Sequence, residues 1–126
     1  MACDRQPTVL IIEDDPSLRA SMQRTLRGQR YRILEAGEGG EGMKMLETHP
    51  VDVVLVDMFM PGKEGVETIR DIRRSYPNVK IIAMSGGGTK GEIGVLLVAK
   101  AMRCHQTLVK PFSGDDLINA IEAQLS

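Results

Sequence analysis

Tryptophan is absent from this 126-residue chain, which has only two tyrosines and two phenylalanines. A hydrophobic core must therefore be built from aliphatic side chains and from the eight methionines. Cysteine is also scarce: Cys3 and Cys104 lack the spacing of a metal-binding or redox pair, so we expect free thiols in a reducing cytoplasm. No apolar run is long enough to cross a bilayer, and no signal-peptide pattern begins the chain. We therefore expect a cytoplasmic protein without a membrane partner.

The chain also lacks an excess of charge of either sign. Its 16 basic and 17 acidic residues give a formal net charge of −1. This balance, without a basic patch or a helix-turn-helix segment, disfavours nucleic acid as a direct partner. No linker-like stretch divides the sequence, and its length suits one hydrophobic core. We expect a single domain over residues 1–126, with its core at about residues 7–125.

Short apolar runs alternate with segments of helical periodicity. Asp15 followed by Pro16 is typical of a helix start, and Ser113 with Asp116 forms a candidate capping box. Strands are predicted at residues 8–12, 31–36, 53–56, 79–84 and 107–109, and helices at 16–27, 38–48, 64–76, 89–102 and after residue 113. The alternation predicts an α/β fold: a doubly wound, five-stranded parallel sheet of the flavodoxin-like (βα)5 type with strand order 2-1-3-4-5.

Polar side chains stand at the carboxyl ends of four predicted strands: Glu13 with Asp14, then Asp57, Ser85 and Lys110. In open α/β sheets the functional site lies at that edge. The order 2-1-3-4-5 makes the first and third strands neighbours, so the three carboxylates should converge. Each residue alone has an ordinary structural explanation, such as a helix cap, a turn or a solvated side chain. Their joint placement favours a functional site.

Three converging carboxylates repel one another unless a hard cation lies among them. Mg²⁺ prefers oxygen ligands and keeps several waters, which leaves positions for phosphoryl oxygens. A lysine adds positive charge, and a serine hydroxyl adds a hydrogen-bond donor. Together these groups form a clamp for a transferring phosphoryl group, with Asp57 as the nucleophile.

Four motifs carry a family resemblance. In this order and spacing, the stretches Ile11–Pro16, Val56–Gly62, Met84–Gly86 and Val109–Phe112 resemble the receiver domain of two-component response regulators. The resemblance covers essentially the whole chain and indicates a stand-alone receiver. It implies that Asp57 accepts a phosphoryl group from a phosphohistidine on a histidine kinase or histidine phosphotransfer protein, or from a small donor such as acetyl phosphate. It also implies catalysis of the chain's own phosphorylation and dephosphorylation only.

The resemblance further implies a metal site. By motif match, Asp14 is a direct ligand of Mg²⁺ or Mn²⁺, and Glu13 acts through water. Asp57 supplies a carboxylate oxygen, and the main-chain carbonyl of Phe59 supplies another ligand.

Two further residues match the family's phosphoryl-contacting groups. Ser85 matches the switch hydroxyl, and Lys110 matches the site lysine, whose peptide bond to Pro111 would be cis. The family usually has an aromatic residue three positions before that lysine, where this chain has Thr107. How Thr107 relays phosphorylation is therefore open.

The helix expected at residues 89–102 is unusually apolar from Ile93 to Ala99. With strand 107–109 and the last helix it forms the family's common output surface, which we expect to bind a downstream protein target or to form a homodimer. Deeper packing of this helix is the alternative. Arg19, Arg24 and Arg27 are interpreted as a solvated face rather than a kinase contact, and His49 and His105 as ordinary surface or loop residues.

Two other functions occur on related folds. An aspartyl-phosphate phosphatase or phosphotransferase of the haloacid dehalogenase type needs an Asp two residues after its nucleophile, where this chain has Phe59. Flavin binding needs a phosphate-cradling loop after the first strand, where Glu13, Asp14 and Asp15 would repel the phosphate. Both are therefore disfavoured.

Overall fold

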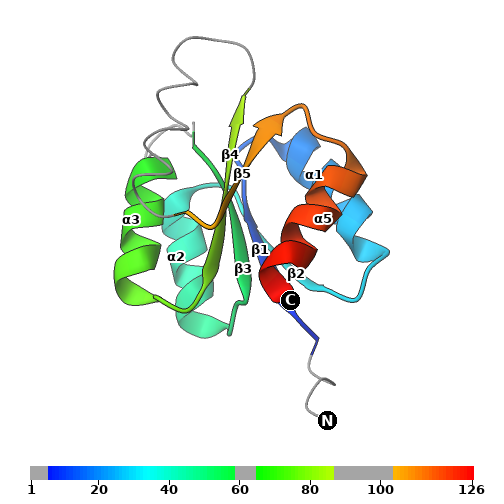
Figure 1. Ribbon diagram of the computed structural model, residues 1–126. Coiled ribbons are helices and arrows are strands. Elements are labelled where there is room, and N and C mark those ends of the chain that lie inside the picture. Colours follow the sequence, from blue (N-terminus) through cyan, green and yellow to red (C-terminus); the bar gives the residue numbers. More distant parts are fainter. Residues whose placement is uncertain (1–5, 59–64, 87–103) are drawn as a thin grey trace.

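The computed structural model describes residues 6–58, 65–86 and 104–126 and shows a five-stranded parallel sheet with helices on both faces (Figure 1). The strands lie in the order β2-β1-β3-β4-β5, which confirms the predicted topology. The strands are β1 (Thr8–Ile12), β2 (Arg32–Ala36), β3 (Val53–Asp57), β4 (Lys80–Gly86) and β5 (Gln106–Lys110), and the helices are α1 (Pro16–Arg27), α2 (Gly39–Thr48), α3 (Gly65–Ser75) and α5 (Gly114–Leu125). The helix expected at residues 89–102 lies outside the described residues.

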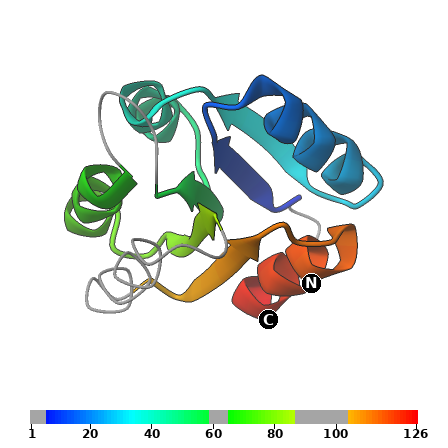
Figure 2. The same cartoon turned by 90° about the horizontal axis from the view of Figure 1, so that it is seen from above.

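Each face of the sheet carries its own hydrophobic core. The helices α1 and α5 cover one face, and α2 and α3 cover the other (Figure 2). In β1, Leu10 and Ile12 point into the core beneath α2 and α3, whereas Val9 and Ile11 point into the core beneath α1 and α5. Because successive side chains of a strand alternate between faces, a strand covered on both sides must be apolar throughout. This explains the unbroken apolar runs of β1 and β3.

The helix caps form as the sequence predicts. The Asp15 side chain accepts hydrogen bonds from the amides of Ser17 and Leu18, with Pro16 in the first turn of α1. Ser113 and Asp116 make the capping box of α5. These local hydrogen bonds fix where each helix begins after its strand, and so fix the loops that border the carboxyl edge of the sheet.

The predicted strand limits are wrong by one or two residues at several ends. The strand β4 continues through Ser85 to Gly86, because Ser85 pairs with Val109 of β5. The strand β2 begins at Arg32 rather than at Tyr31, whose buried ring instead donates its hydroxyl hydrogen bond to Glu122 of α5. Hydrogen bonding between neighbouring backbones sets these strand limits. The length of an apolar run in the sequence indicates them only approximately.

His105 is an exposed residue in the bend before β5, as the sequence predicts, and it also makes two contacts with the main chain of β4. Its main-chain amide donates to the Ile81 carbonyl at 2.9 Å, and the Ile81 amide donates to the His105 Nδ1 atom at 3.0 Å. A side-chain nitrogen thus takes the place of a carbonyl where β4 and β5 begin to pair. Burial lowers the pKa of His105, and Lys80 and Arg73 add to this by charge, so the neutral ring that accepts this bond is favoured.

Of the two cysteines, Cys104 is a free thiol whose pKa burial raises to about 11, and Cys3 lies outside the described residues. In the described part of the chain, no helix has the length and apolar character that a membrane span requires.

Candidate functional site

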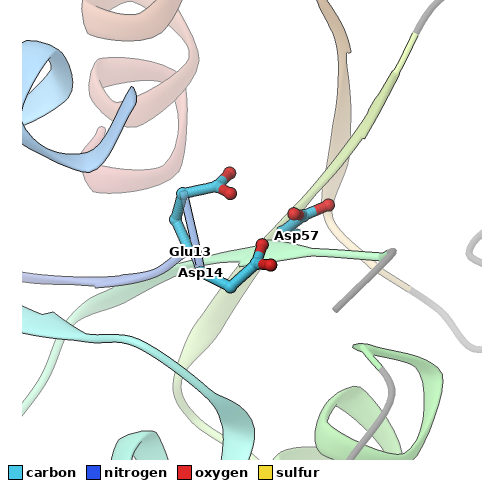
Figure 3. A group of neighbouring side chains, drawn as sticks. All are labelled: Glu13, Asp14 and Asp57. Carbon is cyan, nitrogen blue, oxygen red and sulfur yellow. The ribbon is translucent and has the colours of Figure 1, made fainter. Parts of the chain in front are cut away.

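Three carboxylates meet at the carboxyl edge of the sheet (Figure 3). Glu13 and Asp14 follow β1 directly, and Asp57 is the last residue of β3. Because β1 and β3 are adjacent in the sheet, these positions are neighbours in space. One oxygen from each carboxylate lies within 4.8 Å of the other two. The structure therefore brings together the three side chains that the sequence grouped as metal ligands.

Lys110, the last residue of β5, extends into this group. Its Nζ atom lies 2.8 Å from Glu13 Oε1 and 3.4 Å from Asp57 Oδ2. Glu13 and Asp57 are 1% and 3% exposed, and Asp14 is more accessible. Three carboxyl groups face one ammonium group in this largely buried space, so acidic groups are in excess. A divalent oxygen-seeking cation such as Mg²⁺ fits both the charge and the donor atoms.

The pKa values at the site respond to this crowding. Burial raises the pKa of Glu13 to about 7, although hydrogen bonds from Lys110 and from the Asp15 amide oppose the rise. Burial alone would lower the pKa of Lys110, but its hydrogen bond to Glu13 and the charge of Asp57 outweigh burial and raise it. The lysine therefore stays positively charged beside the acids.

Every polar atom of Glu13 has a partner. Its amide donates to the Ala36 carbonyl at 3.0 Å, and its carbonyl accepts from Arg19 Nη1 at 2.7 Å. Its carboxylate accepts from Lys110 and, at 3.1 Å, from the Asp15 amide. The turn that presents the acidic pair is thereby fixed at both its backbone and its side chain.

The interpretation of Arg19 as part of a solvated face is wrong. Besides the Glu13 carbonyl, its guanidinium contacts Glu35 of β2, with 3.3 Å between Arg19 Nε and Glu35 Oε1. Helical side chains tilt toward the helix N-terminus, so an arginine in the first turn can reach back to the end of the preceding strand. The place of Arg19 in the first turn of the predicted helix was the sequence feature that could have indicated this contact.

Ser85 lies fully buried near the end of β4, between the strands that carry Asp57 and Lys110. Its hydroxyl has no hydrogen-bond partner among the described residues. A buried hydroxyl left unpaired costs on the order of 1–3 kcal/mol. A group that supplies an acceptor atom at this edge would remove that cost.

The first residue of α3 approaches the acceptor strand very closely. A Cβ atom added to Gly65 would lie 2.3 Å from the Asp57 carbonyl oxygen and 2.6 Å from Met58 Cα. Only glycine lets α3 begin at this distance from the backbone that carries Asp57.

A cavity of about 470 Å³ opens beside Lys110. It is lined by Asp15 and Leu18 at the start of α1 and by Lys110, Pro111 and Phe112 after β5. The Lys110–Pro111 peptide bond is cis, as the resemblance implied. The lysine thus lies between the carboxylates and an accessible hollow at the surface.

Of the two remaining residues singled out in the sequence, the structure describes Thr107 but not Phe59. Thr107 is half-buried in β5 and pairs with Ala83 of β4. Phe59, expected to supply a carbonyl ligand, lies outside the described residues.

Comparison with known proteins points to one family. The family model of the response regulator receiver domain matches residues 9–122. The hydrogenase transcriptional regulatory protein HoxA of Cupriavidus necator is 32% identical over 96% of this chain, and the transcriptional regulatory protein PdtaR of Mycobacterium tuberculosis is 36% identical over 94%. A CheY-like response regulator receiver domain protein from Methanospirillum hungatei has the same fold, with a TM-score of 0.88 at 23% identity over 96% of this chain and 94% of that one.

The matched regions are parts of longer proteins. This chain spans 25% of the length of HoxA and 56% of the length of PdtaR. The likeness therefore concerns the receiver portion of these regulators.

Proposed function

Because the chain belongs to the response regulator receiver domain family, we propose that Asp57 is the phosphoacceptor of a two-component or phosphorelay switch. The observation that carries this proposal is the convergence of Glu13, Asp14 and Asp57 with the Lys110 ammonium at the carboxyl edge of the sheet. The receiver fold is that of a signalling switch rather than of an enzyme acting on an external substrate. We propose residues 1–126 as one receiver unit.

Receiver domains bind Mg²⁺ in an acidic pocket, and the residues of this pocket fit the ion. Glu13, Asp14 and Asp57, with the Phe59 carbonyl, would hold Mg²⁺ or Mn²⁺. When bound, the ion neutralises charge on the acidic side chains and on the incoming phosphoryl oxygens.

The protein groups divide the remaining work. An Asp57 carboxylate oxygen attacks the phosphorus of a phosphohistidine, so that an O–P bond forms while the N–P bond breaks and the imidazole leaves. The Lys110 ammonium balances negative charge on the phosphoryl oxygens. The Ser85 hydroxyl, buried and unpartnered among the described residues, donates a hydrogen bond to one of those oxygens.

The partners follow from this chemistry. The donor is a histidine kinase or a histidine phosphotransfer protein, which places the switch in the cytoplasm. The output is a protein contact, with no direct nucleic-acid binding. Val109 of β5 supports an output surface on that strand, because it is the large apolar side chain most exposed in the described part of the chain, at 47%. A downstream target or a homodimer would cover β5 and α5, whereas residues 89–102, also expected to belong to this surface, lie outside the described residues.

The first test is formation of the adduct. Incubation with Mg²⁺ and acetyl phosphate is expected to give an acid-stable, base-labile phosphoryl adduct, seen as a mass increase. Asp57→Ala should abolish it, because the acceptor oxygen is gone. Asp115→Ala, which removes an exposed carboxylate from α5, serves as the matched control and should be phosphorylated normally. An adduct that persists in Asp57→Ala would refute the assignment.

A further inference from the structure

We propose that Arg19 is a positioning residue of the magnesium site, which directs the Asp14 carboxylate toward the ion by fixing the Glu13 carbonyl. The inference rests on the function proposed above, since it assigns a role toward the ion of that site. It adds a residue that contacts neither the ion nor the phosphoryl group.

The guanidinium of Arg19 joins three segments. Its Nη1 atom donates to the Glu13 carbonyl at 2.7 Å, and its Nε atom lies 3.3 Å from Glu35 Oε1. The side chain is 25% exposed, so it is substantially withdrawn from solvent. Through this one group, the first turn of α1 is tied to the end of β1 and to β2.

The orientation of the Glu13 carbonyl affects the direction of Asp14, because the peptide bond between the two residues is planar. The carbonyl oxygen of Glu13 and the amide nitrogen of Asp14 belong to one rigid plane, so they turn together. The Glu13 amide is already held by the Ala36 carbonyl. With both sides of Glu13 fixed, the chain enters Asp14 in one direction, and the Asp14 side chain leaves toward the site.

Asp14 depends on this support more than its neighbours do. Asp57 is the last residue of a strand and still pairs with Met84 of β4, and the Glu13 carboxylate is held by Lys110. Asp14 lies beyond the end of β1 and is the most exposed of the three carboxylates. Its direction is therefore set by the peptide units on either side of it: Arg19 holds the first, and the Glu13 carboxylate holds the second through the Asp15 amide.

An arginine suits this task. The guanidinium is planar and its donors point in fixed directions, so a contact at Nε orients the contact at Nη1. Glu35 thus holds the group that holds the Glu13 carbonyl. A lysine at the same position would present a point charge without this fixed geometry.

Charge and positioning predict opposite changes in Mg²⁺ affinity when Arg19 is removed. Arg19 carries a positive charge near a cation site, so its removal should tighten Mg²⁺ binding if charge alone mattered. Loss of positioning should weaken binding. The sign of the change therefore separates the two explanations.

The experiment measures the Mg²⁺ dissociation constant by isothermal titration of the full chain. We expect binding about tenfold weaker in Arg19→Gln, by analogy with other residues that orient metal ligands. Arg24→Gln is the matched control, because it removes the same charge from an exposed position on the same helix. Its dissociation constant should stay within about twofold of the wild-type value.

Glu35→Gln extends the test through a double-mutant cycle. It removes the carboxylate that orients Arg19, so we expect about threefold weaker binding, below the range for direct loss of such a partner. In the Arg19→Gln background it should have no further effect, since both changes act through one contact. If Arg19→Gln fails to fold, Arg19→Lys tests the inference instead: it keeps the positive charge but loses the fixed donor geometry, so Mg²⁺ binding should still weaken.

The outcomes are distinguishable. Mg²⁺ binding by wild type with an unchanged or smaller dissociation constant in Arg19→Gln would overturn the inference alone, and so would reduced stability with unchanged Mg²⁺ affinity. Absence of Mg²⁺ binding by the wild-type chain would contradict the proposed function and, with it, this inference.

Discussion

Lys110 pairs with carboxylates from two separate segments of the chain. It lies closer to Glu13 than to Asp57, so its ammonium is already held at the site before a phosphoryl group arrives. A charge that is in place beforehand needs little rearrangement during transfer, which is how fixed electrostatic groups accelerate reactions. Glu13 therefore has two roles at residue scale: it is proposed to hold the ion through water, and it holds the lysine directly.

His105 makes stability depend on pH. Its folded-state pKa is lowered, so as pH falls through about 6.5 the unfolded chain takes up a proton that the folded chain resists. The contribution of His105 to stability should therefore be full above pH 7 and decrease as the pH is lowered. Glu13, whose folded-state pKa is about 7, acts in the opposite sense over the same range, so the test compares variants. We expect the urea midpoint at pH 7.5 minus that at pH 5.5 to be smaller in His105→Asn than in the wild-type chain, because the asparagine oxygen can accept the Ile81 bond but does not titrate.

The control for this prediction is the other histidine. His49→Asn should keep the pH difference of the wild-type chain. Equal pH differences in the wild-type chain and in His105→Asn would show that His105 is not the responsible group.

At the scale of single residues, the sequence predicted which side chains form the acidic site, but it did not predict all of their contacts. Glu13, Asp14 and Asp57 could be grouped because strand ends are recognisable and the strand order places two of them side by side. The contacts of Arg19 with the Glu13 carbonyl and of His105 with the Ile81 amide were not predicted, because these partners are main-chain groups. Main-chain donors and acceptors are identical at every residue, so the sequence does not mark which of them a side chain will meet.

At the scale of elements, the contact between α3 and β3 limits what can change near Asp57. Gly65→Ala would place a methyl group against the backbone of Asp57 and Met58. We expect a loss of about 1–3 kcal/mol in unfolding free energy, typical of overpacking, together with slower adduct formation because the backbone of Asp57 must shift. Urea denaturation and the rate of phosphorylation by acetyl phosphate measure the two effects.

Gly28 provides the matched control. It caps α1 in an ordinary right-handed conformation, and an added Cβ would meet nothing closer than 3.9 Å. Gly28→Ala should leave phosphorylation unchanged and raise stability by about 0.4–1 kcal/mol, because the unfolded chain loses freedom. Equal effects of the two substitutions would argue against the proposed steric contact.

Element boundaries were predictable where local chemistry decides them. Asp15, Pro16 and Ser113 mark helix starts because their effect is confined to one turn. Ser85 was expected to follow β4, yet it lies within it. Its inclusion depends on pairing with β5, more than 20 residues later in the chain, which no local pattern reports.

At the scale of the whole molecule, the acidic pocket couples ion binding to folding. A ligand that binds only the folded chain stabilises it, by about 2.7 kcal/mol at a concentration one hundred times its dissociation constant. We expect Mg²⁺ to raise the urea midpoint of the wild-type chain. Asp14→Asn should lose most of this shift, because a charged ligand becomes neutral.

The control here is Asp115→Asn, which changes an exposed carboxylate of α5 and should keep the full shift. A shift that survives in Asp14→Asn would place the ion elsewhere on the protein.

The order of the strands was the most predictable feature of all. Parallel strands joined by helices have few allowed arrangements, so the alternation of elements was enough to predict which strand ends meet. The two separate cores follow from the same arrangement, since a sheet between two helical layers must be apolar on both faces.

The pairing at the start of β5 has a consequence at the far edge of the sheet. Lys110 ends an outer strand whose only neighbour in the described sheet is β4, so its reach toward Asp57 depends on the alignment of these two strands. A slip by one residue would move Lys110 by about 3.3 Å and turn it to the other face. The reciprocal bonds between His105 and Ile81 fix the register of β4 and β5 where their pairing begins, and every later pair along the two strands follows from it. The distance between the Lys110 ammonium and Asp57 thus depends on two residues, His105 and Ile81, that lie outside the acidic site.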